Sequence, residues 1–240
     1  MYSVWPISAV MSLLTAVLTA LTAFFTPLAG EPAAALAVVG LTVAVRLLLL
    51  PLGVMQVRAE KVRTRLAPRI AEITAKHRND PQKMVAAQQK VYAEAGTSPL
   101  AGCLPSLAQL PVVIALYGVF IGQGPGGGGL LEHTLAGVAL SATPLGAGAP
   151  GLAVFGPLLV LLALVAWASR RFLPMPALTP EAERMARGPI SYLPFMTVVI
   201  AVFVPLAAGL YLLTSGAWAL GERVLLRRVL PEPAVPAAGR

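Results

Sequence analysis

Long apolar runs, separated by polar or glycine-rich stretches, recur along the chain. Five of these runs are candidates for transmembrane helices, which need about 20 mostly apolar residues. The runs cover residues 33–55, 104–122, 152–169, 190–204 and 206–226. The pattern predicts an all-α fold, a polytopic membrane protein whose residues 31–228 form a five-span helical bundle.

Residues 4–29 form a further apolar stretch with a different pattern. Hydroxyl side chains recur along it at steps of four and three, at Ser8, Ser12, Thr15, Thr19, Thr22 and Thr26. This spacing places them on one face of a helix, mainly away from the leucines. We interpret residues 1–30 as an extracytoplasmic amphipathic helix that lies in the membrane interface. An additional membrane span is the alternative.

Residues 58–98 combine charge with two helical apolar stripes. The stripes are Val62, Leu66, Ile70 and Ile73, then Met84, Ala87, Val91 and Ala95. Asp80 followed by Pro81 suits the start of a helix, and Gly96 suits its end. We therefore predict a hairpin of two antiparallel helices. It serves either as a tether that positions the spans or as a basic docking surface for a ribosome, nucleic acid or anionic lipid.

Three less regular segments remain. Residues 123–151 form a Gly-rich loop, and its run 124–129 lacks the Lys-Ser/Thr ending of a phosphate-binding loop, so we expect flexibility there. Residues 170–189 form a second polar loop. Residues 229–240, rich in proline and alanine, are expected to be a disordered tail.

The charged residues give the topology. The chain is 57% hydrophobic and only 12% charged, which excludes an ordinary soluble domain despite a net charge of +8. Apart from Arg46, every Lys and Arg lies in 58–98, 170–189 or the C-terminal end, which is the distribution of a membrane protein and not a sign of nucleic-acid specificity. The positive-inside rule then puts the N-terminus and residues 123–151 outside, and 58–98, 170–189 and the C-terminus in the cytoplasm.

Arg46 stands alone inside the apolar run 33–55. An arginine in a span costs at least ~2.5–3.5 kcal/mol on insertion scales, so it needs a partner in the fold or a water-filled cavity. Snorkelling to the headgroups is the simpler alternative. Thr42, four residues earlier, shares its helix face. An intramembrane charge of this kind is by default a functional site.

Catalytic and metal-binding patterns are missing from the sequence. Cys103 is the single cysteine, and His77 and His133 lie far apart in different loops. We therefore expect no enzymatic activity, no metal site and no cofactor.

The order of these parts resembles the YidC/Oxa family of membrane protein insertases. The residues that carry the likeness are Thr42 through Arg46 with Leu50-Pro51, the basic hairpin, Gly102-Cys103-Leu104-Pro105 with Gln109 and Pro111, and Tyr192-Leu-Pro through Tyr211. The likeness covers about residues 30–228 and is closest to the compact form found in Gram-positive bacteria, which implies a bacterial plasma membrane location.

The resemblance implies a hydrophilic groove, open to the cytoplasm and to lipid, in which Arg46 attracts polar segments of nascent membrane proteins. Thr42, Gln109 and Tyr211 would line this groove. The hairpin would contact substrate, the ribosome or the Sec translocon through its basic residues: Arg58, Lys61, Arg63, Arg65, Arg69 and Lys83. Apolar spans of the client would pass into the lipid bilayer without nucleotide hydrolysis.

A second function fits the same residues. Arg46 would serve as an anion site in a small membrane transporter or channel subunit. Nascent-chain crosslinks near Arg46 favour the insertase, and solute flux favours the transporter.

Overall fold

The computed structural model describes residues 5–98, 104–122, 129, 132–173 and 188–232. They fall into two compact units, each built from several stretches of the chain. The first unit contains Met1–Leu49, Gln109–Ser169 and Pro194–Leu220, and the second contains Leu50–Ala108, Arg170–Leu193 and Gly221–Arg240. The described part of the chain is helical apart from short loops and one two-stranded hairpin, so the predicted all-α class is confirmed.

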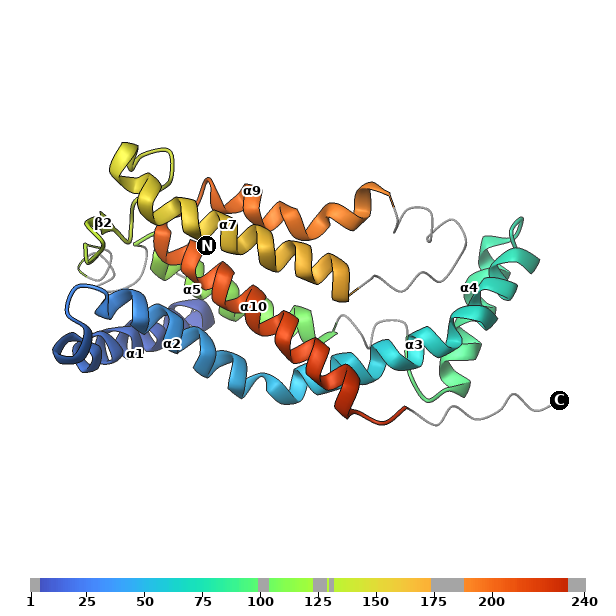
Figure 1. Ribbon diagram of the computed structural model, residues 1–240. Coiled ribbons are helices and arrows are strands. Elements are labelled where there is room, and N and C mark those ends of the chain that lie inside the picture. The colour runs from blue at the N-terminus through green and yellow to red at the C-terminus, as the bar shows by residue number, and fades with distance from the viewer. Residues whose placement is uncertain (1–4, 99–103, 123–128, 130–131, 174–187, 233–240) are drawn as a thin grey trace. The chain divides into compact units, whose positions relative to one another are not determined.

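The first unit is a bundle of apolar helices (Figure 1). It contains α1 (Trp5–Ala29), α2 (Ala33–Leu48) and α9 (Met196–Ala201), with most of α5 (Leu104–Phe120), α7 (Gly148–Phe172) and α10 (Leu206–Val229). Its core is a cluster of buried side chains from these helices, with Leu18, Val38 and Leu116 among the most enclosed.

Helices α1 and α2 form an antiparallel pair, joined by a turn in which Gly30 takes a φ of +65°. The face of α1 that is buried carries both Leu14 with Leu18 and Thr15 with Thr22. The predicted separation of a hydroxyl face from a leucine face is therefore wrong. The reason is local: the Thr22 hydroxyl donates to the Leu18 carbonyl within its own helix at 2.8 Å, so it is buried without an unpaired polar group.

Helices α7 and α10 approach closely at glycines of α10. A Cβ built on Gly209 would lie 2.8 Å from Leu158 Cδ2, and one on Gly216 would lie 3.4 Å from Val165 Cγ1. Small residues allow the two helix backbones to approach closely, and the van der Waals packing that results favours helix association in lipid. This contact fixes one side of α10, the helix that carries Tyr211 and Ser215.

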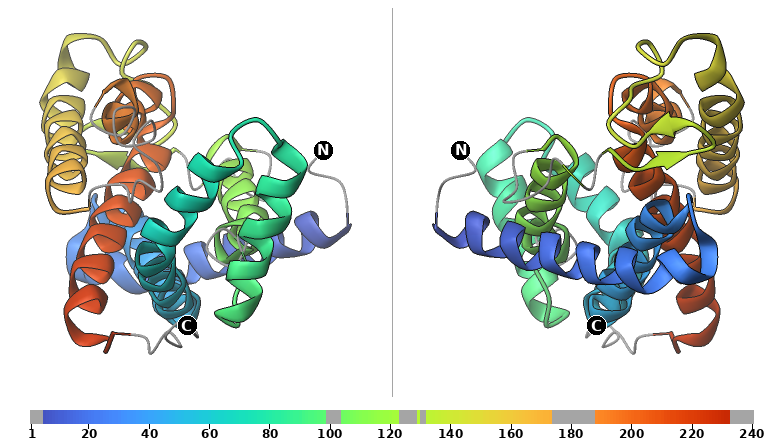
Figure 2. Two further views of the ribbon diagram at one scale, coloured as in Figure 1. Left: turned by 90° about the vertical axis from the view of Figure 1, so that its right-hand side faces the viewer. Right: turned by 90° about the vertical axis from the view of Figure 1, so that its left-hand side faces the viewer.

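Part of the loop 123–151 has regular structure. Strands β1 (Thr134–Leu135) and β2 (Val138–Ala139) pair antiparallel, and are drawn as arrows in Figure 2. The two residues between them, Ala136 and Gly137, have φ values of 50° and 78°, as a tight hairpin turn requires. The Glu31 carboxylate accepts hydrogen bonds from the Gly137 N–H at 2.8 Å and the Thr134 hydroxyl at 2.7 Å. Most of the glycine run, 123–128, lies outside the described residues.

The second unit contains α3 (Leu50–Lys76), α4 (Pro81–Glu94), most of the short 3-10 helix η1 (Pro189–Phe195) and the end of α10. Helices α3 and α4 pack through Leu66, Ile70, Val91 and Tyr92, which belong to or adjoin the predicted stripes. The predicted start of α4 is confirmed: Asp80 caps it by accepting the Lys83 N–H at 3.1 Å, and Pro81 is the first helical residue. The first helix of the hairpin, α3, begins at Leu50, whereas the hairpin was predicted to begin at Arg58.

Two described helices are each long and apolar enough to cross a membrane, Ser8–Ala29 and Gly151–Phe172. The pair α2 and α3 passes the same test only when taken together across its break at Leu49, so two or three candidate spans are present in the described residues. The predicted run 190–204 is shared between η1 and the six-residue α9. The five-span count therefore stays a prediction, and so does the interfacial placement of residues 1–30.

Candidate functional site

Arg46 lies in the last turn of α2 and points to α10. Its Nε donates a hydrogen bond to the Ser215 hydroxyl at 3.2 Å, and its Nη2 donates to the same oxygen. Ser215 is buried, and Arg46 is half-buried. Among the described residues, Arg46 forms no ion pair with a carboxylate. The charge is thus held by a neutral hydroxyl, which neither neutralises it nor occupies all five guanidinium donors.

Ser215 is the site residue that sequence reasoning missed. It was visible in the sequence as one of several hydroxyls in the last span, and ordinary helix packing was the simpler interpretation. No local pattern could have singled it out, because its partner lies 169 positions away. Only the packing of α2 against α10 brings the two together.

Thr42 lies one helical turn before Arg46 on α2, as predicted. Its side chain is almost fully buried, with 2% of its surface exposed. Its hydroxyl donates to the Val38 carbonyl at 2.7 Å. Thr42 therefore supports the polar character of this stretch of α2, but its donor is already used within the helix.

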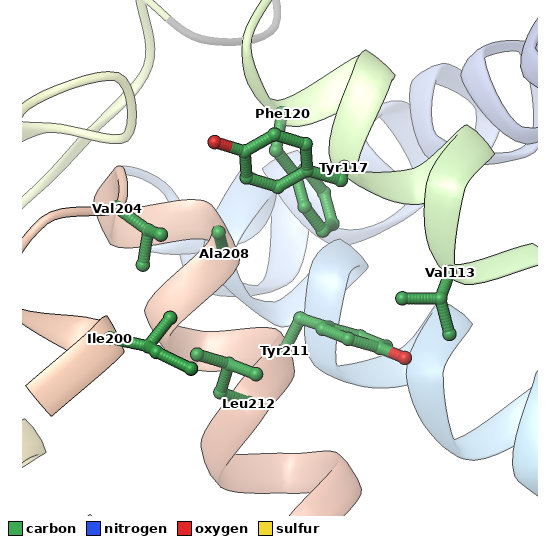
Figure 3. Close-up of a pocket in the computed structure, with 8 residues that line it drawn as sticks. All are labelled: Val113, Tyr117, Phe120, Ile200, Val204, Ala208, Tyr211 and Leu212. Carbon is green, nitrogen blue, oxygen red and sulfur yellow. The ribbon is translucent and has the colours of Figure 1, made fainter. Parts of the chain in front are cut away.

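Tyr211 lines an apolar pocket between α5, α9 and α10 (Figure 3). The pocket has a volume of about 440 Å³, counted out to its open mouth. Its lining side chains are Val113, Tyr117, Phe120, Ile200, Val204, Ala208, Tyr211 and Leu212. The rings of Phe120 and Tyr211 lie 6.2 Å apart between centroids. The side of Tyr211 that faces the pocket is thus apolar, and its place in a hydrophilic groove stays a prediction.

One stripe of α10 joins the pocket to the arginine. Ala208, Tyr211 and Leu212 line the pocket, and Ser215 follows Tyr211 by four residues. Residues at this spacing share a helix face and rise by about 6 Å. The charge of Arg46 and the apolar pocket are therefore neighbours along α10. Gln109 belongs to α5 by its backbone, but its side chain lies outside the described residues.

The six basic residues named for the predicted hairpin lie in the second unit, and four of these six have acidic partners. Arg69 pairs with Glu94 at 3.0 Å, and Lys83 pairs with Asp80 at 3.0 Å. Arg58 is exposed, and Arg63 is half-buried. Such exposed pairs contribute little to stability, since the median value is about 0–1 kcal/mol. They show that this positive surface is partly covered by the chain itself.

Lys61 and Arg65 converge on one carboxylate, that of Glu232. Lys61 Nζ lies 3.2 Å from Glu232 Oε1, and Arg65 Nη2 lies 3.0 Å from Oε2. Lys61 also donates to the Leu230 carbonyl at 2.8 Å. The hydrogen bond from Lys61 is the main reason that the pKa of Glu232 lies below its usual value. Residues 229–232 are therefore not disordered as predicted, and 233–240 lie outside the described residues.

A family profile described as "60Kd inner membrane protein" matches residues 24–233. The chain belongs to this family. The match confirms the resemblance to the YidC/Oxa family that was drawn from Arg46, the segment Gly102-Cys103-Leu104-Pro105 and the last spans. It also indicates that the apolar helices lie in a membrane.

Several named proteins are similar to this chain over part of their length. "Membrane protein insertase YidC" of Streptomyces avermitilis is 28% identical over 225 residues, which cover 82% of this chain and 52% of that protein. "Membrane protein insertase YidC" of Clostridium perfringens is 43% identical over 82 residues, or 34% of each chain. "Inner membrane ALBINO3-like protein 2, chloroplastic" of Chlamydomonas reinhardtii is 28% identical over 208 residues, covering 80% and 49%. The chain spans about half of these relatives or less.

Within this family, the arrangement of charge and pocket is suited to the binding of an anionic group next to an apolar segment. A guanidinium beside a neutral hydroxyl attracts an anionic group, and the attraction is stronger in a low-dielectric setting than in water. Within the described residues, no three His, Cys, Asp or Glu side chains are grouped as metal ligands would be. The site can therefore attract an anionic group to Arg46 next to the apolar pocket lined by Tyr211.

Proposed function

We propose that this chain is a membrane protein insertase and chaperone, which takes polar segments of nascent membrane proteins to Arg46 and releases their apolar spans into lipid. The observation that carries the proposal is the half-buried Arg46 held by the neutral Ser215 alone among the described residues. A structural arginine in a membrane is normally paired with an acid or lies in the headgroup region. One that keeps its charge uncompensated is available to an incoming acidic segment.

The physical steps follow from this site. An acidic or polar stretch of the client is drawn to the guanidinium, since desolvation strengthens the attraction between opposite charges. Apolar side chains of the client then meet the pocket at Tyr117, Phe120 and Tyr211, one turn away along α10. Transfer of the apolar span into lipid supplies the driving force, at about 0.8 kcal/mol for each buried CH₂ group. No nucleotide is required for any of these steps.

The proposal includes a topology and partners. The N-terminus lies outside the cell, and the hairpin of α3 and α4 lies in the cytoplasm, where its basic surface would meet the ribosome or the Sec translocon. The support is the distribution of Lys and Arg along the chain. Family membership supports the clients, since relatives are named as insertases.

A reconstituted system tests the proposal. The full chain is placed in liposomes of neutral and anionic lipid, and a short client with one acidic residue before its apolar span is synthesised in their presence. A photocrosslinker replaces Tyr117, which is 41% exposed and lines the pocket, and a control crosslinker replaces Trp167, which is 55% exposed on α7. We expect protease-protected client and crosslinks from position 117 that exceed those from position 167.

Substitution of Arg46 separates the insertase from other functions. Arg46→Ala should lower insertion of the acidic client about tenfold or more, and Arg46→Lys should preserve much of it, because the charge is retained. Insertion that does not depend on the chain, together with anion flux that is lost in Arg46→Ala, would contradict the insertase and establish the transporter.

A further inference from the structure

The strongest feature outside the proposed groove is the contact between the end of α10 and the basic face of α3. Lys61 and Arg65 lie one turn apart on α3 and share the carboxylate of Glu232. Arg65 also donates from Nε to Glu232 Oε2 at 3.1 Å. Two cations thus hold one anionic group through three close contacts, which is the arrangement of an anion-binding site.

The site is built independently of Glu232. Arg227 of α10 pairs with Glu60 of α3, and both side chains are largely covered. Lys61 donates to the Leu230 carbonyl at the end of α10, and only 13% of its side chain is exposed. These contacts hold Lys61 and the end of α10 in place without any contribution from Glu232. Lys61 therefore keeps its position whether or not a carboxylate is bound.

Glu232 is the replaceable member of the group. Its side chain is 61% exposed, against 39% for Arg65 and 13% for Lys61. It lies three residues beyond Val229, the last residue of α10. Exposed ion pairs of this kind contribute little and are screened by salt. Another anion can therefore displace Glu232 without any change in the packing of α3.

The position of the pair along α3 indicates which anion. Residues 50–57 are apolar apart from Gln56, and Arg58, Lys61 and Arg65 follow at steps of three and four on one helix face. At 1.5 Å per residue, Lys61 and Arg65 lie about 6 and 12 Å beyond Val57 along the axis. This is the depth of lipid headgroups next to the end of an apolar segment, where clustered Lys and Arg bind anionic lipid.

We propose that Lys61 and Arg65 form a binding site for the phosphate of an anionic phospholipid headgroup, and that Glu232 competes for this site from within the chain. When Glu232 occupies the site, the segment after α10 is held on α3. The lipid-bound state releases that segment from α3. This inference does not rest on the insertase function, because it concerns lipid binding alone.

Lipid retention by the full chain tests the site. The protein is purified in a mild neutral detergent, and binding of phosphatidylglycerol and phosphatidylcholine is measured by native mass spectrometry. Glu232→Gln should raise phosphatidylglycerol binding about two- to fivefold, since it removes the competitor but leaves both cations. Phosphatidylcholine binding should not change. Glu72→Gln is the matched control, because Glu72 is exposed on the same helix and away from the site.

A second pair of variants locates the effect. Arg65→Gln should lower phosphatidylglycerol binding and should remove the gain of Glu232→Gln in the double variant. Arg78→Gln, at an exposed position beyond α3, should do neither. Melting temperatures identify any misfolded variant, and Arg65→Lys, which retains the charge, should then keep most of the lipid binding.

Three results would overturn the proposal. An equal gain in Glu232→Gln and Glu72→Gln would show an effect of net charge only. A gain that survives Arg65→Gln would place the lipid elsewhere. A gain in binding of a short single-stranded RNA, with no gain for phosphatidylglycerol, would assign the cations to a different partner.

Discussion

Arg46 and Ser215 are 169 positions apart in the sequence, and two nitrogens of one guanidinium donate to one hydroxyl oxygen across α2 and α10. The pair links the helix that carries the charge to the helix that carries the pocket. It also leaves the charge uncompensated, because a hydroxyl accepts the hydrogen bonds without supplying a negative charge. Stability and binding therefore make opposite demands on this pair, and substitutions can separate them.

Ser215→Ala should destabilise the fold by about 1.5–3 kcal/mol, the usual contribution of a hydrogen bond to a charged group. Ser215→Thr is the control, since it keeps the hydroxyl. Thermal or denaturant unfolding in detergent provides the measurement. An alanine variant as stable as the wild type would show that Arg46 finds an equally good acceptor elsewhere.

Adding Arg46→Met to Ser215→Ala should recover stability, because an apolar pair replaces a charge that has lost its acceptor. The double variant should unfold at a higher temperature than Ser215→Ala alone. Its insertion of clients with acidic segments should fall to the level of Arg46→Ala. A double variant that still inserts such clients would remove Arg46 from the proposed mechanism.

Ala208→Leu should fill part of the pocket beside Tyr211. Ala208 is buried, and the pocket beside it has an accessible volume of about 130 Å³ and an open mouth, so a larger side chain can enter it and the melting temperature should stay unchanged or rise. Crosslinks between a client and position 117 should decrease severalfold, because the apolar contact is occupied. Unchanged crosslinking would place the client outside this pocket.

Gly209→Val should weaken the packing of α7 on α10 by about 1–3 kcal/mol, the usual cost of excess volume in a packed interior. The first added carbon already lies 2.8 Å from Leu158 Cδ2. Gly221→Val on the same helix meets nothing within 4 Å and provides the control. Comparison of the two melting temperatures separates the steric effect from the change in helix propensity.

Asp80→Ala should loosen the first turn of α4, while Asp80→Asn should preserve the cap. The hydrogen bond from the Lys83 N–H, followed by the Lys83 side chain, lowers the pKa of Asp80 below its usual 3.8. The contribution of the cap is therefore complete above that value and is lost as pH falls through the lower folded pKa. Hydrogen exchange of the amides of residues 82–85, corrected for intrinsic rates, should show a pH-dependent loss of protection in the wild type that Asp80→Asn removes.

The sequence was most informative where one local rule decided the structure. Asp80 and Pro81 start α4, because a carboxylate cap followed by a proline satisfies the first turn without help from the rest of the fold. The apolar stripe through Leu66 and Ile70 on α3 and the one through Val91 on α4 were equally clear, since helix periodicity places each stripe on one face of its own helix. The charge of Arg46 identified the candidate site, because an isolated arginine in an apolar run has an energetic cost that ordinary helix packing does not offset.

The sequence was less informative where distant contacts decided. Ser215 became a partner of Arg46 only through tertiary packing, and one side of Tyr211 lines an apolar pocket with Phe120 of α5 and Val204 of the turn before α10. Glu232 was assigned to a disordered tail from its proline-rich neighbours, but Lys61 and Arg65 hold it. None of these contacts leaves a signal at fixed spacing along the chain.

The hydroxyls of α1 have a consequence for the N-terminal helix. Ser12, Thr19, Thr22 and Thr26 each donate to the carbonyl four residues earlier, so their donors are satisfied inside the helix. These four hydroxyls lose little when the water around them is replaced by hydrocarbon, whereas the buried Thr15 hydroxyl has no hydrogen-bond partner among the described residues. A change in bilayer thickness can then be met by a shift of α1 together with α2, without loss of these four hydrogen bonds.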